Sequence, residues 1–180
     1  MLKEEELYQQ CLEGKRSAQK ELFDRYSPKM LGICFRYSRS LAEAEDVLQD
    51  AFIRVFQYLP SFKKEGSLEG WVRKIVVNTA LNNIKKNKHI YEEQEIEHAK
   101  SIETEQDNSV ENYDSKLIWE TMHQLPEGYR LILNLYAIEG YSHKEIAEQL
   151  NIAEGTSRSQ FLRAKLQLQK LLEKNHILIK

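Results

Sequence analysis

Apolar residues recur every three or four positions along most of this chain, which is the spacing that buries one face of an α-helix. Alternation of apolar and polar residues is nowhere sustained long enough to predict a β-sheet. The sequence therefore predicts an all-α protein. The expected helices are 4–12, 18–37, 42–58, 68–86, 114–124, 127–138, 142–150 and 155–173.

Local signals place several helix ends. Ser40 and Glu43 are three residues apart, as are Ser142 and Glu145, and each pair predicts a capping box that opens a helix. Pro60 is expected to stop the helix that begins after Ser40. In the second half of the chain, a proline at position 126 suits the first position of the next helix.

The segment 141–168 carries the strongest functional signal. Two helical patterns meet at Asn151, a residue type that tolerates the left-handed backbone of a sharp turn. This predicts a helix-turn-helix, whose second helix lies in the major groove of DNA. Its buried stripe is expected to be Phe161, Ala164, Leu168 and Leu171. Rotated away from that stripe are side chains that can contact base edges: Arg158, Ser159, Leu162 and Arg163. An amphipathic hairpin whose basic residues only face water fits the same pattern.

The helix predicted at 42–58 has one apolar and one polar face. The apolar face comprises Val47, Leu48, Ala51, Phe52, Val55 and Leu59. The opposite face comprises Asp46, Gln49, Asp50, Ile53 and Gln57. An isoleucine among polar groups suits a protein-binding stripe with one apolar anchor. A solvated face with a single stray isoleucine is the alternative.

The segment 62–88 mixes aromatic, basic and amide side chains. They are Phe62, Lys63, Lys64, Ser67, Trp71, Arg73, Lys74, Asn78, Asn82 and Asn83. Basic groups follow phosphates, aromatic faces stack on unpaired bases, and asparagine can hydrogen-bond a base edge. The mixture favours single-stranded DNA over duplex, although Phe62 and Trp71 could instead be core residues.

Charge is distributed unevenly along the chain. Lys and Arg number 26 and Asp and Glu 28, so the net charge of −2 is unusual for a DNA-binding protein. Residues 71–88 nevertheless contain no acidic side chain, whereas 90–114 are dominated by them. We expect two helical domains, 1–88 and 114–180, joined by a flexible acidic linker at 89–113. The electrostatic field near each basic patch, and not the net charge, then decides where DNA phosphates bind.

Other classes of function lack support in the sequence. The five histidines show no paired metal-ligand spacing, and there is no glycine-rich phosphate loop. Cys11 and Cys34 are far apart and are expected to be reduced thiols. We therefore expect no enzyme activity, no cofactor and no metal. There is no signal peptide and no apolar run of membrane-spanning length, so a cytoplasmic protein without membrane insertion is expected.

Three stretches together resemble one protein family. They are AEDVLQDAFIRVF (44–56), GWVRKIVVNTALNNIKK (70–86) and LPEGYRLILNLYAIEGYSHKEIAEQLNIAEGTSRSQFLRAK (125–165). In this order they resemble the polymerase-docking helix, the −10 helix and the −35-reading region of bacterial RNA polymerase sigma factors of the extracytoplasmic-function (ECF) group, in the sigma-70 family. The resemblance implies a transcription initiation factor whose partners are the clamp and flap of core RNA polymerase, promoter DNA and an anti-sigma factor.

The resemblance also implies roles for individual residues. The clamp-facing residues would be Asp46, Gln49, Asp50 and Ile53. The loop that captures a flipped −10 base would include Phe62, Lys63, Lys64, Ser67 and Leu68. The path of the −10 strand would be lined by Trp71, Arg73, Lys74, Asn78, Asn82 and Lys85. The −35 duplex would be contacted by Thr156, Arg158, Ser159, Leu162 and Arg163.

Three positions depart from the family's usual pattern. Asn82 stands where many members have Asp, Asn151 replaces a common turn glycine, and Ser157 replaces a common buried valine. We expect Ser157 to loosen the second domain's core. A stand-alone helix-turn-helix regulator is the alternative function. Such a regulator would footprint duplex DNA without polymerase.

Overall fold

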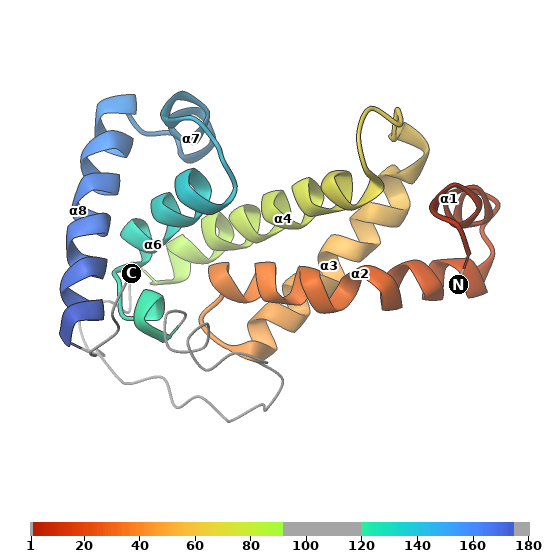
Figure 1. Ribbon diagram of the computed structural model, residues 1–180, viewed down its shortest axis with the longest axis horizontal. Coiled ribbons are helices and arrows are strands. Elements are labelled where there is room, and N and C mark those ends of the chain that lie inside the picture. The colour runs from red at the N-terminus through yellow and green to blue at the C-terminus, as the bar shows by residue number, and fades with distance from the viewer. Residues whose placement is uncertain (1, 92–119, 175–180) are drawn as a thin grey trace. The chain divides into compact units, whose positions relative to one another are not determined.

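A computed structural model of the protein describes residues 2–91 and 120–174 (Figure 1). Every regular element in these two ranges is helical, so the all-α prediction is confirmed. The chain divides into two compact units, Met1–Thr104 and Glu105–Lys180. Most of the predicted acidic linker and of the predicted helix at 114–124 lies outside the described residues.

The first unit packs three long helices around a shared core, with a shorter helix against them. Its elements are α1 (Glu4–Leu12), α2 (Arg16–Tyr37), α3 (Leu41–Tyr58), the 3₁₀ turn η1 (Leu59–Ser61) and α4 (Leu68–Tyr91). Helices α2, α3 and α4 all contact one another, and α1 packs on α2. Fully buried core side chains include Leu22, Met30, Val55, Val72 and Val76. The predicted apolar face of α3 is buried as expected.

Helix boundaries in this unit follow the sequence closely. Helix α1 has the predicted bounds, α2 begins two residues earlier than predicted, and α4 continues five residues past 86. Residues 89–91 were expected to start the linker and are instead the last turn of α4. Helix α3 ends just before Pro60, as predicted, and the chain continues as the 3₁₀ turn η1.

The predicted capping box at the start of α3 is only half formed, because the Glu43 side chain does not bond the Ser40 amide. Ser40 Oγ accepts a hydrogen bond from the Glu43 amide at 3.2 Å. The Glu43 carboxylate, however, accepts from the Arg39 amide at 2.7 Å, one residue before the cap. Its other oxygen accepts from the Asn83 side chain at 3.0 Å. Glu43 therefore joins the start of α3 to α4.

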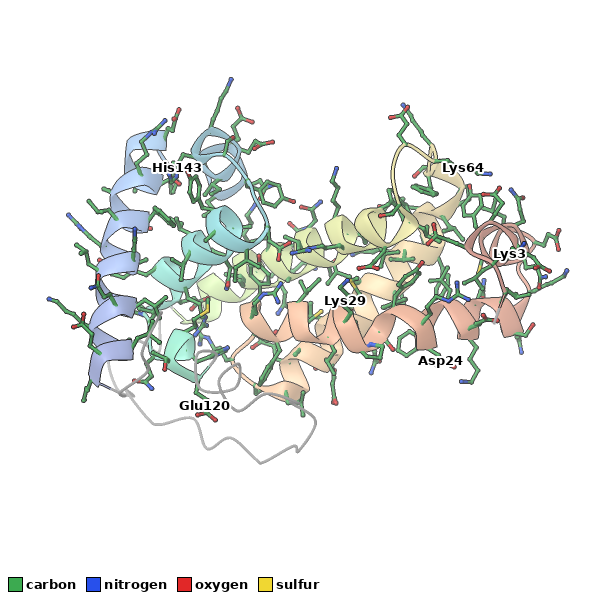
Figure 2. All side chains as sticks on the ribbon, viewed as in Figure 1. Lys3, Asp24, Lys29, Lys64, Glu120 and His143 are labelled. Atoms are coloured by element: carbon green, nitrogen blue, oxygen red, sulfur yellow. The ribbon has the colours of Figure 1, made fainter. Side chains whose placement is uncertain are left out.

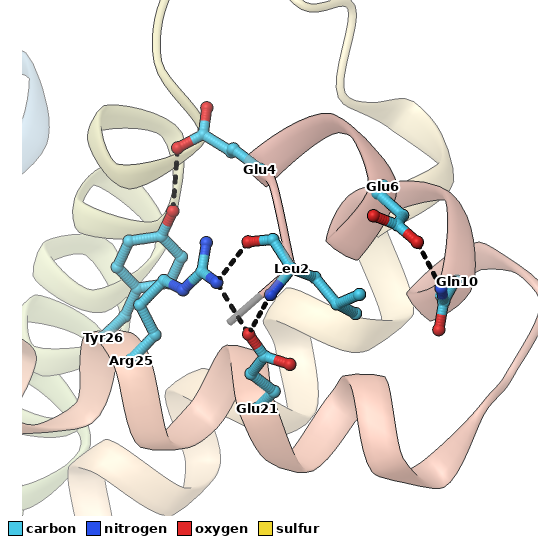
Figure 3. Close-up of polar contacts among 7 residues, drawn as sticks. All are labelled: Leu2, Glu4, Glu6, Gln10, Glu21, Arg25 and Tyr26. Carbon is cyan, nitrogen blue, oxygen red and sulfur yellow. Dashed lines mark hydrogen bonds and ion pairs between the residues drawn. The ribbon is translucent and has the colours of Figure 1, made fainter.

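Helix α1 is tied to α2 by a polar cluster (Figure 3). The Leu2 amide donates to Glu21 Oε1 at 2.9 Å, and Arg25 donates to the Leu2 carbonyl at 2.7 Å. Arg25 also forms an ion pair with Glu21 at 2.7 Å. The Tyr26 hydroxyl donates to Glu4 at 3.0 Å. Burial, together with the Glu4 carboxylate, raises the pKa of Tyr26 to about 12, so its hydroxyl remains a donor.

The second unit contains the helix-turn-helix. Residues 120–123 are helical, and the following elements are α6 (Glu127–Leu133), the π-helical turn η2 (Asn134–Ile138), α7 (His143–Leu150) and α8 (Glu154–Lys174). Pro126 is the N-cap of α6 and not its first helical residue as predicted, because its ψ of 141° is extended. Its carbonyl oxygen accepts the Arg130 amide at 3.0 Å.

A small apolar core holds α6 and α8 together. Met122, Leu125, Leu133 and Ala164 form the buried cluster. Tyr129, Phe161, Leu168 and Leu171 pack against it, so the stripe predicted for the second helix of the helix-turn-helix is confirmed. Ser157 and Leu172 on α8 are also buried.

Candidate nucleic-acid interface

The turn between α7 and α8 has the geometry expected from its sequence. Ser142 Oγ accepts from the Glu145 amide at 3.2 Å, and the Glu145 carboxylate accepts from the Ser142 amide at 2.8 Å, so the predicted capping box is confirmed. Hydrogen bonds from Ser142 lower the pKa of Glu145. Asn151 ends α7 in the left-handed conformation, with φ 54° and ψ 48°. The chain therefore reverses sharply into α8.

His143 connects the two helices of this motif. Its Nδ1 lies 2.9 Å from the hydroxyl oxygen of Ser157 on α8, in a hydrogen bond. The imidazole ring, labelled in Figure 2, stacks on Tyr136 with 4.2 Å between centroids, and Phe161 meets it edge-on. Burial and then the positive charge of Arg158 lower the pKa of His143. The buried Ser157 therefore has a hydrogen-bond partner, and the expected loosening of the core there stays a prediction.

The predicted −35 face of α8 is open to solvent. Arg158, Ser159, Leu162 and Arg163 are exposed, and Thr156 is half-buried. Arg158 donates to Glu154 one turn earlier, at 2.5 Å. Leu166 extends the same face and is 52% exposed. The sequence analysis missed it, although its position four residues after Leu162 was a signal.

The predicted polymerase-binding residues lie together along α3. Asp46, Gln49, Asp50 and Ile53 are all exposed. Their spacing of three and four residues places them on one side of the helix. The Ile53 side chain is 56% exposed, so the stripe contains one accessible apolar group between acidic and amide neighbours.

The loop between η1 and α4 is held by aromatic contacts. The Phe62 ring lies between Trp71 of α4, at 5.4 Å between centroids, and Tyr8 of α1, at 5.7 Å. Lys64 pairs with Glu5 of α1, and its ammonium lies 5.0 Å from the centroid of the Tyr8 ring. At the end of the loop, the hydroxyl oxygen of a serine at 67 accepts from the backbone amide at 70, at 3.1 Å.

Most of the predicted −10 residues on α4 share an exposed stripe. Lys74, Asn78, Asn82 and Lys85 are exposed, and Trp71 is half-buried beside them. At about 100° per residue, these five lie within one quarter of the helix circumference. The sequence left two alternatives for Trp71, a core residue or a ring that stacks on DNA bases. Its ring packs on Phe62 and still reaches the surface, so it has features of both.

Two predicted −10 residues do not belong to this surface. Leu68 is 1% exposed and packs in the core of the first unit. Arg73 is half-buried and lies about 200° around α4 from Trp71, away from the stripe. The sequence grouped both with their chain neighbours without regard to helical rotation, and their contact with DNA stays a prediction.

Residues 2–91 and 120–174 contain neither a cluster of metal ligands nor a membrane-spanning helix. There, His, Cys, Asp and Glu side chains form no group of three that could hold a metal ion. No helix within these ranges has the length and apolar character needed to cross a membrane. Cys11 and Cys34 are buried free thiols, and burial raises the pKa of Cys34 to about 12. His98 and His176 lie outside the described residues.

Comparison with known proteins agrees with the two-unit division. Residues 22–90 match the family description Sigma-70 region 2, and residues 115–168 match Sigma-70, region 4. The RNA polymerase sigma-H factor of Pseudomonas aeruginosa is 30% identical over 92% of this chain and 93% of its own length. The ECF RNA polymerase sigma-E factor of Haemophilus influenzae is 29% identical over 91% and 92%.

The fold has also been observed in solved structures. The sigma factor RpoE of Bartonella quintana, crystallised with the anti-sigma factor NepR, matches with a TM-score of 0.58. Its sequence is 21% identical, and the match covers 86% of this chain and 96% of that one.

These observations define the protein as a non-enzymatic transcription initiation factor that directs RNA polymerase to promoters. The chain belongs to the sigma-70 family of RNA polymerase sigma factors, within the ECF group. The predicted family is thereby confirmed, and the alternative of a stand-alone regulator is not supported.

Proposed function

We propose that the two units contact separate parts of one promoter, with domains at 1–88 and 114–180 joined through 89–113, where α4 continues to Tyr91 and the rest forms a flexible acidic linker. The first unit binds and opens the −10 element, and the second reads the −35 duplex. The observation that carries this proposal is the presence of two different exposed surfaces, the lysine and asparagine stripe of α4 and the arginine-bearing face of α8.

The α4 stripe suits an unpaired strand. Lys74 and Lys85 supply positive charge at its two ends, and Asn78 and Asn82 lie between them with amides that can bond base edges. Extracting a base from the duplex costs a few kcal/mol. Binding of the extracted base near Phe62 and Trp71 offsets this cost, because aromatic stacking contributes about 1–3 kcal/mol per base. Lys63 and Lys64 attract the phosphates beside it.

The α8 face suits the major groove. Arg158 must exchange its bond with Glu154 for a guanine edge when DNA binds. An exposed ion pair contributes only about 0–1 kcal/mol, whereas a bidentate contact with guanine discriminates by about 1–3 kcal/mol. The exchange therefore favours DNA. Leu162 is placed to contact a thymine methyl, and Thr156 and Ser159 to bond phosphate or bases.

The exposed stripe on α3 suits the polymerase clamp. Asp46 and Asp50 present negative charge in the two turns of α3 before the apolar Ile53. A partner surface with an apolar depression rimmed by basic groups complements this arrangement. The polymerase flap is the partner we assign to the second unit.

We assign the protein to the cytoplasm, because core polymerase and promoter DNA must both be accessible to it. We also propose that an anti-sigma factor regulates it. The support is the fold that the chain shares with the Bartonella quintana sigma factor, which was crystallised with its anti-sigma factor. An inhibitor that covers the α3 stripe or the α8 face would block the proposed contacts.

Transcription in vitro with purified core polymerase and a promoter library tests the proposal. We expect specific RNA starts only when the protein and the core enzyme are both present, and no footprint from the protein alone. Failure to start RNA synthesis on any promoter would contradict the proposed function. A footprint on duplex DNA by the free chain would favour the regulator.

A further inference from the structure

Helix α1 contacts the proposed −10 loop through two neighbouring side chains. Tyr8 meets Phe62 edge-on, with ring planes at 73°, and is itself 6% exposed. Glu5 pairs with Lys64, whose ammonium also lies over the Tyr8 ring. Hydrogen bonding to Lys64 lowers the pKa of Glu5, so its carboxylate stays charged. Residues far apart in the sequence therefore meet at this loop.

The backbone of the loop is one that few residue types adopt without cost. Lys64 has a φ of 59°, in the left-handed region, and Gly66 has a φ of 99°. Residues 63–66 are exposed, so apolar packing does not fix the middle of the loop. Lys64 instead reaches back to α1. A lysine in the left-handed region persists when surrounding contacts determine its conformation, and Tyr8 and Glu5 provide such contacts.

Helix α1 is rigidly placed for this purpose. Tyr26 and Arg25 of α2 hold its first residues through Glu4, at 3.0 Å, and the Leu2 carbonyl, at 2.7 Å (Figure 3). A ring fixed on α1 is therefore fixed relative to the core. Phe62 then contacts two rings from different helices, Tyr8 of α1 and Trp71 of α4.

We propose that Tyr8 is a positioning residue for the −10 loop, which orients Phe62 and Lys64 before DNA arrives. This inference rests on the proposed function. A loop ordered in advance binds an unpaired base without first losing conformational freedom, so affinity and base discrimination both increase. Tyr8 acts through Phe62 and Lys64, because its own ring is almost fully covered.

Holoenzyme made from core polymerase and the full chain provides the test. The probes are −10 oligonucleotides, either intact or carrying an abasic site at each position in turn. Wild type should prefer the intact strand over at least one abasic strand. For Tyr8→Leu, we expect that preference to fall roughly threefold to tenfold, the effect of losing one or two aromatic contacts. Tyr8→Phe keeps the ring and should behave as wild type.

A merely structural role would give a different result. If Tyr8 only fills the core, Tyr8→Leu lowers the melting temperature and leaves the intact-to-abasic preference unchanged, which would overturn the inference. Binding to core polymerase and to −35 duplex should be the same as in wild type. A wild-type holoenzyme that shows no preference at any position contradicts the proposed function itself, so the two failures are distinguishable.

If Tyr8→Leu does not fold, a second pair of variants tests whether α1 positions the −10 loop. Glu5→Gln removes the partner of Lys64 at an exposed position, where packing does not change. Glu6→Gln makes the same change in charge on the same helix, at a carboxylate that accepts only from Gln10 among the bonds drawn in Figure 3. We expect Glu5→Gln to reduce the preference about twofold, less than the loss of a ring contact. Equal behaviour of the two variants would overturn the inference.

Discussion

At the scale of single residues, the turn before α8 depends on a backbone conformation that few side chains accept. Asn151 has a φ of 54° and a ψ of 48°. For Asn151→Ala we expect a loss of about 1–2 kcal/mol in the free energy of unfolding, because alanine lacks the short polar side chain whose local hydrogen bonding offsets the cost of this conformation. Asn151→Gly should match wild type. Urea unfolding of the two variants measures the difference, and equal stabilities would mean that the turn rearranges.

His143 predicts a pH dependence in the second unit. Its pKa is lowered in the folded state, first by burial and then by Arg158, from an ordinary value of 6.5. The unfolded chain therefore binds the proton more readily, and stability present above pH 6.5 is lost as the pH falls below that value. Urea unfolding between about pH 7.5 and about pH 5.5 should show this loss.

Replacing the titrating group provides the control. His143→Gln retains a polar side chain near Ser157 but cannot take up a proton in this range. We expect its stability to vary less between about pH 7.5 and about pH 5.5. An unchanged slope in this variant would assign the pH dependence to another group.

At the scale of single elements, α3 offers the clearest test of polymerase binding. Ile53 is 56% exposed on a stripe whose neighbours are acidic or amide residues. Ile53→Asp should abolish holoenzyme assembly with little change in stability, because a buried apolar anchor typically contributes at least about 2 kcal/mol to an interface. Ile53→Leu keeps an apolar anchor and should assemble nearly normally. Native gel shift with core polymerase measures both, and normal assembly by Ile53→Asp would refute the docking face.

Helix α8 makes a separate prediction about sequence reading. Arg158→Ala should weaken binding by about 1–3 kcal/mol on promoters that present guanine at the contacted −35 position. Arg158→Lys retains the charge but not the two-pronged donor geometry, so it should lose discrimination while keeping the salt dependence. Holoenzyme binding to a panel of −35 variants measures both effects. A uniform loss across all sequences would place Arg158 on phosphate only.

The sequence predicted elements better than it predicted surfaces. Helical periodicity and caps are local, so the starts of α3 and α7 and the left-handed Asn151 could be foreseen. The same periodicity places Leu68 with the buried Val72 and Val76, and so apart from the exposed stripe of α4. By contrast, the meeting of Tyr8 with Phe62 joins residues 54 positions apart, and no local pattern indicates it.

At the scale of the whole molecule, charge arrangement outweighs total charge. The net charge is −2, yet the α4 stripe presents Lys74 and Lys85 without an acidic neighbour between them. Lys85→Gln should reduce the slope of log affinity against log salt for the −10 strand by about 0.7, as expected for one phosphate contact. Lys86→Gln, about 100° around the helix, should leave the slope unchanged. Equal slopes for the two variants would contradict a −10 strand that runs along the α4 stripe.

The π-helical turn η2 has a consequence for chain length. The Glu139 amide bonds the Asn134 carbonyl five residues back, at 3.0 Å, so this turn contains one more residue than a regular one. Deleting a single position here would restore ordinary winding and shift the side chains within the turn around the helix axis. Tyr136 would then lose its place on His143. The number of residues between α6 and α7 is thus as constrained as their identity. Relatives that lack one residue at this point would need a compensating change in how their recognition helix is supported.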